Sequence, residues 1–379
     1  MAKKVTIIDI ARLAGVSRTT VSRVLNHRPD VDDATRERVL AVIEEQGFVP
    51  SITAAGLAGG QSHLIGMLVP SFSWPMIPEL MRGIAEVVNE TAYELVLYTF
   101  NDEDFDRNSS NIINRLLATQ LTAGILAVFP SRATPLLTRL YQQGLPVVVI
   151  DDQSEHSAPW VRPDNVTGAY LAVRHLISLG HRRIAHIQGP SEYLVSHDRH
   201  QGYLRALQEA GITPDHELIL KGDFLPPSGR ACASKLFALP PEKRPTAIFA
   251  STDQMAYGVL VAADEFGLVV PNDVALVGFD DDAPSAHVRP PLTTIRQPSF
   301  EMGRRGIELL ISLVSPEEEA AHDGASPGKK ERKITAGQQR PAAQPIRIEL
   351  PTSLIVRASC GASSHVDWQP SNSTMEGNS

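Results

Sequence analysis

The chain has 379 residues, of which 42% are hydrophobic and 21% are charged, and its formal net charge is −8. This composition is ordinary for a globular protein and excludes a chain that is disordered throughout, while the length predicts two or three domains. There is no run of about 18 uncharged apolar residues, and the stretch after Lys3 and Lys4 lacks the apolar core of a signal peptide. We therefore expect a soluble, cytoplasmic protein without a membrane anchor.

The two cysteines, Cys232 and Cys360, lie far apart, and no residues with metal-ligand spacing surround them. We expect buried or incidental thiols in a reducing compartment rather than a disulfide framework.

Residues 6–26 predict two short helices that meet at a tight turn. Thr6 is suited to cap the first helix, with Asp9 completing a capping box. The apolar residues Ile7, Ile10, Ala11 and Ala14 then recur with helical spacing. Gly15 is expected to end the helix in a left-handed conformation. The segment is predicted to be a helix-turn-helix, in which Val16 fills the corner, Ser17 caps the second helix, and Val21, Val24 and Leu25 form its buried stripe.

The outward face of the second helix has the chemistry of a surface that enters the major groove of DNA. Arg18 and Thr19 stand at the start of the helix and are the predicted base contacts, because arginine pairs with guanine and short hydroxyl side chains contact base edges. Further DNA contacts are predicted at Thr6, Ser17, Thr20, Ser22, Arg23 and Asn26. A polar outward face is also what a solvated helix shows. Charge favours DNA, because the first 28 residues carry six basic side chains and one acidic one in an acidic chain.

The run VTIIDIARLAGVSRTTVSRVLN resembles the DNA-binding headpiece of the LacI/GalR (lactose-repressor) family, and later segments match that family in order to about residue 360. A third helix, capped by Asp32 and Asp33, is expected to run to Gly47 and to complete a headpiece over residues 1–48. Residues 49–63 are rich in small residues, which by composition alone indicates a linker. The resemblance implies a hinge that forms a helix over the minor groove, with DNA contacts from Ala54 and from Leu57 as an apolar wedge.

From Leu64 onward, short apolar strands alternate with helical stretches, a pattern typical of parallel sheets covered by helices. Strands are predicted at 64–69, 94–99, 123–129, 146–150, 183–188, 217–221, 246–250 and 274–279. Helices are predicted at 78–91, 109–119, 133–143, 166–179, 198–210, 229–238, 253–266 and 300–314.

The resemblance implies that residues 64–360 form an α/β, periplasmic-binding-protein-like effector-binding and dimerisation domain of two lobes. The N-lobe is expected at about 64–162 and 293–315, and the C-lobe at about 163–292 and 346–358. The chain is expected to cross between the lobes near 151–164, near 291–295 and near the last strand. The whole is thus predicted to be multidomain, with an N-terminal all-α helix-turn-helix headpiece.

Residues 315–346 are rich in proline, glycine, alanine and charge, so we expect a disordered insertion. Deleting 316–344 is expected to leave the fold and DNA binding nearly unchanged. The tail 361–379 is polar and is expected to be disordered. It has no leucine heptads, which argues against a C-terminal helical tetramerisation bundle.

Ligands of parallel α/β sheets bind beyond the carboxyl ends of the strands, so the residues just after each strand are the candidates for an effector site. They combine aromatic faces with a few polar groups, which suits a sugar, and the resemblance gives Arg199, Phe224 and Asp280 effector-binding positions. The candidates are Phe72, Trp74, Met76, Tyr193, Val195, His197, Arg199, Phe224, Thr252, Asp253 and Asp280. Phe72 and Phe224 would equally permit stacking on a purine-like co-repressor.

Neither a metal nor another cofactor is predicted. The acidic run 280–282 is more typical of a solvated loop than of a cation site, and His175, His181 and His186 fall on a helix, a turn and a strand. The sequence contains no phosphate-binding loop, zinc helix, nucleophile elbow or dinucleotide fingerprint.

We therefore expect a homodimeric transcriptional repressor, not an enzyme, that binds a pseudo-palindromic operator in double-stranded DNA under the control of a small molecule, preferably a sugar. The rival functions are a solute-binding protein of a transporter, which would need export, and an enzyme that acts on a sugar. The sequence leaves open whether the ligand releases or promotes operator binding.

Overall fold

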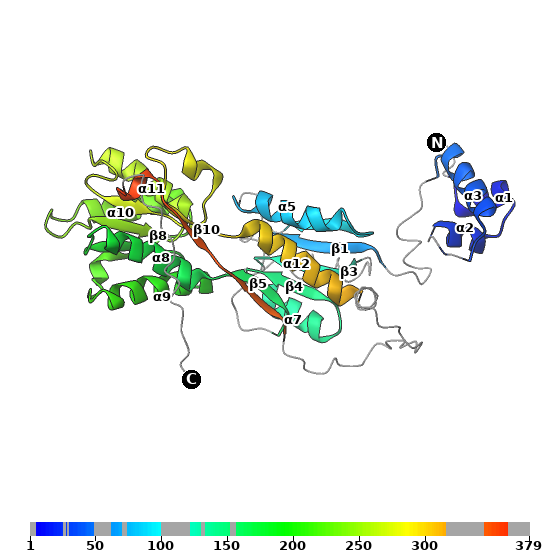
Figure 1. Cartoon of the computed structure of the whole chain (residues 1–379), viewed down its shortest axis with the longest axis horizontal. Coiled ribbons are helices and arrows are strands. Elements are labelled where there is room, and N and C mark those ends of the chain that lie inside the picture. Colours follow the sequence, from blue (N-terminus) through cyan, green and yellow to red (C-terminus); the bar gives the residue numbers. More distant parts are fainter. Residues whose placement is uncertain are drawn as a thin grey trace, which may run out of the picture. The chain divides into compact units, whose positions relative to one another are not determined.

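The structure, a computed structural model, describes residues 5–25, 28, 30–48, 62–69, 74–99, 122–129, 133–151, 157–315 and 345–362. The described residues up to Ser62 form one compact unit, the headpiece, and those from His63 onward form another, the body (Figure 1). No helix among the described residues is long and apolar enough to cross a membrane.

The headpiece contains three helices, α1 (Ile7–Ala14), α2 (Arg18–Leu25) and α3 (Asp33–Glu45). The predicted capping box is confirmed, because Thr6 accepts a hydrogen bond from the Asp9 backbone while the Asp9 carboxylate accepts one from the Thr6 backbone. Gly15 ends α1 with a φ of 65°, and Asp32 caps α3. One face of each helix packs into a single core, which contains the buried residues Ile10, Ala11, Ala14, Val21, Val24, Val31 and Val39.

The N-lobe of the body is a six-stranded parallel sheet in the order β11-β5-β4-β3-β1-β2. Its central strands are wholly buried, as expected for a parallel sheet covered on both faces. The strands are β1 (Leu64–Val69), β2 (Glu94–Thr99), β3 (Thr122–Val128), β4 (Val147–Ile150), β5 (Trp160–Pro163) and β11 (Arg347–Leu350). The helices that accompany this sheet are α5 (Ile77–Val88), α7 (Thr134–Gln142) and α12 (Ser299–Val314).

The C-lobe is a second parallel sheet in the order β7-β6-β8-β9, with core clusters on both faces. The strands are β6 (Ile184–Gln188), β7 (Ile219–Lys221), β8 (Ala247–Ala250) and β9 (Ala275–Val277), with an antiparallel pair β10 (Thr294–Arg296) and β12 (Ser353–Ile355). The helices are α8 (Asn165–Ser178), α9 (Leu194–Glu209), α10 (Pro226–Phe237) and α11 (Asp253–Glu265), with short 3-10 turns η3 (His216–Leu218), η4 (Ala283–Ala286) and η5 (Ala358–Cys360).

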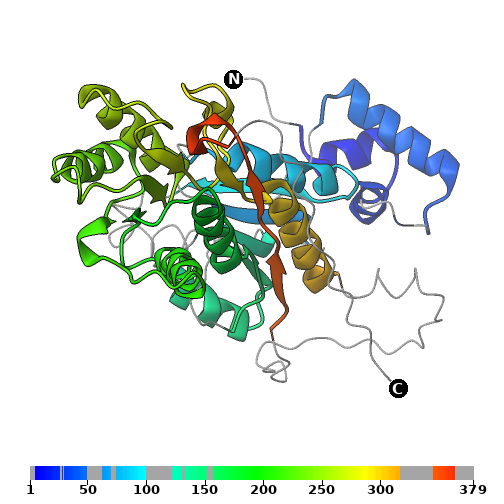
Figure 2. The same ribbon diagram turned by 60° about the vertical axis from the view of Figure 1, so that its left-hand side comes forward.

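The chain joins the two lobes three times, at 163–165, at 297–298 and at 351–352. Two lobe boundaries differ from the expected ones. β11 pairs with β5 and therefore belongs to the N-lobe, where Ile348 and Leu350 pack against the core. β10 pairs with β12 and bridges to the end of β9, so residues 294–296 belong to the C-lobe. In Figure 2 the β11–β12 segment passes from one lobe to the other.

Several elements were missed or misplaced by the sequence analysis. β5 and β10 were not predicted, because they are short and lack a long apolar run. α9 begins at Leu194 rather than at 198, so the segment after β6 is largely helical. The predicted helix 109–119, the hinge, most of the insertion 315–346 and most of the tail lie outside the described residues.

Candidate functional site

The outward face of α2 presents polar side chains to solvent. Ser17, Arg18, Thr19 and Arg23 are exposed, whereas Val21 and Val24 are buried against the other two helices. Arg18 and Thr19 occupy the first turn, and none of the described residues forms an ion pair with Arg18. Arg23 lies 3.2 Å from Asp30 in an exposed ion pair. The helix thus offers a basic, hydroxyl-bearing surface of the kind that enters a major groove.

Three predicted DNA contacts also have a structural role. The Ser17 hydroxyl accepts the Thr20 backbone N–H at 3.0 Å and lies 2.9 Å from the Thr20 hydroxyl, so these two residues begin α2 together. The Thr6 hydroxyl donates to Asp9 at 2.7 Å. Ser22 is half-buried. The predicted contacts Asn26, Ala54 and Leu57 lie outside the described residues.

In the C-lobe, Arg199 on α9 is the centre of a buried polar network. It is 3% exposed, and its Nε donates to Asn165 Oδ1 at 2.9 Å while Nη1 donates to the Ser251 carbonyl oxygen. Nη2 lies 3.5 Å from the Asp280 carboxylate, and the guanidinium stacks 3.7 Å from the centre of the Phe279 ring. Burial lowers the pKa of Arg199, while the charges of Asp280 and Asp151 oppose that change.

Asp280 follows β9 with a φ of 125°, a conformation that L-residues rarely adopt. Its carboxylate accepts a 2.6 Å hydrogen bond from Gln297 in addition to facing Arg199. Burial raises the pKa of Asp280, and Arg199 partly offsets that shift. The neighbouring acidic residues have different partners, since Asp281 pairs with Arg296 and Arg357 and Asp282 accepts from Gln254.

Strained backbone marks the carboxyl ends of several strands. Among the described residues, positive φ at non-glycine positions occurs only beyond strands β3, β4, β7 and β9, in Phe129, Asp151, Phe224, Asp280 and Asp281. Strain of this kind costs of order 1–3 kcal/mol per residue and gathers at functional sites. These strained residues therefore lie at the same sheet ends where the effector contacts were predicted.

Aromatic rings accompany these strand ends in both lobes. In the N-lobe, Trp74 stacks on Phe129 with ring centres 5.1 Å apart, and Met76 packs against the same core. In the C-lobe, Tyr193 lies 5.7 Å from Phe224 in a tilted pair. The Phe224 ring rests on Gly189, where a Cβ would come within 2.0 Å of it. Phe72 lies outside the described residues.

Buried polar atoms without a protein partner lie on two residues that bond the Arg199–Asp280 pair, and on Ser196, which is one turn before Arg199 in α9. Among the described residues, Ser196 Oγ, Ser251 Oγ and Gln297 Oε1 are buried and accept or donate no hydrogen bond. The Ser251 carbonyl is an acceptor for Arg199, and Gln297 bonds Asp280. Unsatisfied buried groups are uncommon in folded proteins, and a hydrogen-bonding ligand is one way to satisfy them.

Other predicted effector contacts have internal partners in this structure. Thr252 caps α11 and donates to the Phe224 carbonyl oxygen at 3.2 Å. Asp253 is fully buried and accepts hydrogen bonds from Ser285, Thr294 and the Asp282 backbone. The Asp253 carboxylate thus holds the loop after β9 through these bonds, and its contact with an effector stays a prediction. His197 is exposed and bonds the Ser191 carbonyl oxygen at 2.8 Å, and Val195 is half-buried.

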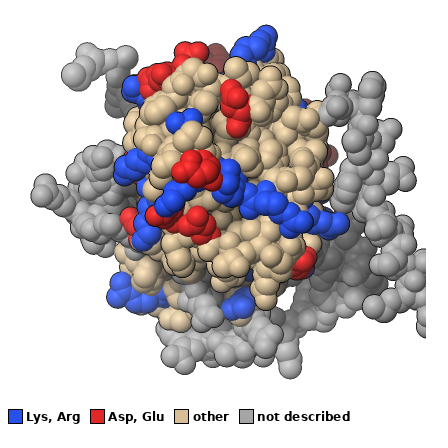
Figure 3. Space-filling view, turned by 90° about the vertical axis from the view of Figure 1, so that its left-hand side faces the viewer, with Lys and Arg blue, Asp and Glu red and all other residues tan. Residues whose placement is uncertain are grey.

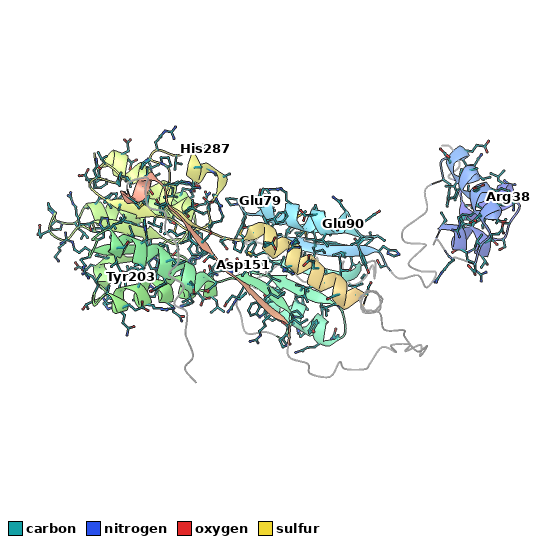
Figure 4. All side chains as sticks on the ribbon, in the orientation of Figure 1. Arg38, Glu79, Glu90, Asp151, Tyr203 and His287 are labelled. Carbon is teal, nitrogen blue, oxygen red and sulfur yellow. The ribbon has the colours of Figure 1, made fainter. Side chains whose placement is uncertain are left out.

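Phe129, Asp151, Asn165 and Gln297 were not predicted from the sequence as site residues. Asp151 directly follows β4, so the rule that selected Trp74 would have found it, whereas Phe129 follows β3 but was the last residue of the predicted strand 123–129. Figure 4 labels Asp151 close to the segments that join the lobes. Asn165 and Gln297 lie at the connections themselves, and only their partners Arg199 and Asp280 reveal them.

The surface at the far end of the C-lobe is not a basic patch. Figure 3 shows basic and acidic side chains interleaved there, and the ion pairs Arg205–Glu209, Arg230–Glu265 and Lys243–Glu217 belong to this lobe. In the headpiece, α2 instead carries the exposed Arg18 and Arg23 beside the hydroxyl side chains of Ser17 and Thr19.

Two protein families match parts of this sequence. Residues 6–51 match the model described as bacterial regulatory proteins, lacI family. Residues 173–360 match the model of a periplasmic binding protein-like domain. The first match covers the helix-turn-helix and the second covers most of the C-lobe.

Individual relatives resemble nearly the whole chain. Catabolite control protein A from Priestia megaterium is 36% identical over 315 residues, which are 83% of this chain and 93% of the relative. A structure of the transcriptional regulator CelR–cellobiose complex is 32% identical with a TM-score of 0.65, covering 94% of this chain and 99% of that one. The lac repressor dimer bound to operator and the anti-inducer ONPF is 27% identical with a TM-score of 0.78, covering 95% and 100%.

Proposed function

The chain belongs to the LacI family of bacterial regulatory proteins as a DNA-binding transcriptional repressor, and we propose that a small carbohydrate controls its hold on an operator. In this proposal two copies bind a pseudo-palindromic site in double-stranded DNA, as a dimer of the similar lac repressor does with its operator. The exposed Arg18 and Thr19 contact bases, and the remaining polar residues of α2 and its flanks contact the DNA backbone.

The observation that carries the carbohydrate proposal is the set of buried polar atoms around Arg199 that lack a protein partner. Ser196, Ser251 and Gln297 offer hydrogen-bonding atoms, and Asp280 and Arg199 offer charge, beside the aromatic side chains of Tyr193 and Phe224. A sugar presents many hydroxyl groups together with C–H faces that stack on rings, so it matches both features. One solved structure of the similar regulator CelR is a complex with cellobiose.

The test begins with selection of bound sequences from random DNA by the purified protein, followed by titration of sugars and purines into the selected complex. We expect a palindrome that one sugar releases. A palindrome that a purine tightens would favour the co-repressor alternative, which the Tyr193–Phe224 ring pair would also accommodate. Sugar binding or turnover without any selected DNA would contradict the proposal.

A further inference from the structure

The two lobes are joined by three chain segments that are tied to one another by hydrogen bonds. The segment at 163–165 meets the segment at 351–352, because the Asp164 backbone donates to the Leu350 carbonyl oxygen at 2.9 Å and Thr352 donates to the Asp164 carbonyl oxygen at 3.2 Å. On the N-lobe side of both, Arg162 lies 2.8 Å from Glu349. These two connections therefore form one linked pair.

The Arg199–Asp280 pair joins this linked pair to the third connection. Arg199 Nε donates to Asn165 Oδ1 at 2.9 Å, and Asn165 is the first residue of α8 on the C-lobe side of the first connection. Asp280 accepts from Gln297 Nε2 at 2.6 Å, and Gln297 stands between β10 and α12 at the remaining connection. A continuous path of polar contacts thus runs from one connection through two charged side chains to another.

Backbone contacts strengthen the path at Asp280. The Asp280 N–H donates to the Ile295 carbonyl oxygen at 2.7 Å, and the Gln297 N–H donates to the Asp280 carbonyl oxygen at 3.3 Å. The side chains of the path are buried, with Asn165 2% exposed and Gln297 6% exposed. Buried hydrogen bonds are geometrically demanding, because water does not replace a lost partner.

We propose that Asn165 and Gln297 are positioning residues that transmit a change at the Arg199–Asp280 pair to the connections between the lobes. A ligand that draws on the Asp280 carboxylate weakens its bond to Gln297 and its attraction for Arg199, and the connection geometry then changes. This inference rests on the proposed control of DNA binding by an effector, because it describes how occupancy alters the body. It assigns the coupling to two amide side chains, of which Gln297 also offers its unpartnered Oε1 to the proposed sugar.

The test measures the distance between the lobes in the full chain without any ligand. Spin labels are attached at Glu90→Cys after α5 and at His287→Cys in the C-lobe, two positions labelled in Figure 4. Both sites are exposed, whereas the native Cys232 and Cys360 are buried, so the labels report on the introduced thiols. Asp280→Asn stands in for the ligand, because it removes the charge that faces Arg199.

We expect Asp280→Asn to shift the distribution of distances between the labels. Gln297→Met, which keeps the length of the side chain and removes its hydrogen bond, is expected to broaden the distribution and to abolish most of the shift caused by Asp280→Asn. Asn165→Ala is likewise expected to broaden the distribution and to reduce the shift caused by Asp280→Asn. Gln254→Ala is the matched control, since Gln254 bonds Asp282 and touches no connection, and it should preserve the full shift.

An unchanged Asp280→Asn shift in both the Gln297→Met and the Asn165→Ala backgrounds would overturn the proposal, as would an Asp280→Asn distribution identical to that of the parent. Circular dichroism of each variant separates loss of coupling from loss of fold. If Gln297→Met fails to fold, Gln297→Glu, which places like charge against Asp280, is expected to shift the distribution instead. The measurement uses neither operator nor sugar. The distance between the labels therefore tests the coupling even if the sugar or the operator has been identified wrongly.

Discussion

The Arg199 guanidinium lies 3.5 Å from the Asp280 carboxylate although Arg199 is almost fully buried. α9 supplies the arginine and the strained turn after β9 supplies the aspartate, so two separate elements of the C-lobe meet in one ion pair. A buried arginine needs such a partner, because an uncompensated charge in a protein interior is strongly destabilising.

Breaking this pair should affect stability and effector binding together. Asp280→Ala removes the partner of Arg199 and the acceptor of Gln297, so we expect it to lower the free energy of unfolding by about 3–5 kcal/mol. Asp280→Asn keeps the acceptor for Gln297 and should destabilise the fold less. It should still greatly weaken the effect of the sugar on operator affinity. Urea unfolding and operator titration measure the two effects. A full sugar response in Asp280→Asn would show that the carboxylate does not serve the effector.

Arg18 should determine one operator position. If two of its N–H groups donate to the O6 and N7 of one guanine, Arg18→Ala should cost about 1–3 kcal/mol of operator affinity and relax the base preference at that position alone. Arg38→Ala is the control, because Arg38 is an exposed arginine of the same unit on α3 (Figure 4). Binding measured against all single-base operator variants distinguishes the two. Preferences that stay unchanged at every position would reject Arg18 as a base contact.

Gly189 should be needed for the position of the Phe224 ring. In Gly189→Ala the new methyl group would lie 2.0 Å from that ring and 2.6 Å from Ser196 Oγ, so the ring must move. An aromatic contact is worth about 0.5–1.5 kcal/mol, which predicts a loss of sugar affinity of about twofold to twelvefold. Calorimetric titration measures the loss, with sugar-free operator affinity as the control. Equal sugar affinities would place Phe224 outside the effector site.

His186 should make the body less stable in acid. It lies in β6, fully buried in a stack with Phe249 and Tyr203, and burial lowers its pKa to about 3. His186 takes up a proton near pH 6.5 in the unfolded chain but only near pH 3 in the folded chain. The free energy of unfolding therefore falls as the pH drops from about 6.5 toward 3. This single group predicts a loss of about 2 kcal/mol between pH 7 and pH 5.

His186→Phe tests that prediction, because phenylalanine keeps the ring stack and does not titrate. His200 stacks on His186 with ring centres 5.5 Å apart and its charge acts on His186, so the difference between the two proteins reports on His186 together with this coupling. Urea unfolding at a series of pH values should show a smaller acid loss in the variant. Parallel stability profiles for the two proteins between pH 7 and pH 5 would contradict the assignment.

Local signals predicted the parts of the chain whose structure depends on neighbouring residues. The capping box of Thr6 and Asp9, the left-handed Gly15 and the long apolar strands are determined within a few residues, and each is confirmed. The short strands β5 and β10 were missed because their stability comes from pairing with β11 and β12, which lie far away in the sequence. The lobe boundaries were misplaced for the same reason.

The candidate site shows the same division. Arg199 and Asp280 were selected by their place in the sequence, and the structure brings them together. Asp253 has the same chemistry and the same position after a strand, yet its carboxylate faces inward to Ser285 and Thr294. Direction of a side chain at a strand end depends on the loops that cover it, and this information is not local. No sequence pattern identifies Asn165 and Gln297, whose role follows only from their hydrogen bonds to Arg199 and Asp280.

The most direct test of sugar-controlled operator binding is to measure the affinity of the releasing sugar for the free protein and for the protein on its selected operator. Linkage requires that the sugar lower operator affinity by the same factor by which the operator lowers sugar affinity. We predict weaker sugar binding on the operator, with matching factors from the two titrations. Equal sugar affinity in the free and operator-bound protein would contradict the claim that this ligand controls the repressor.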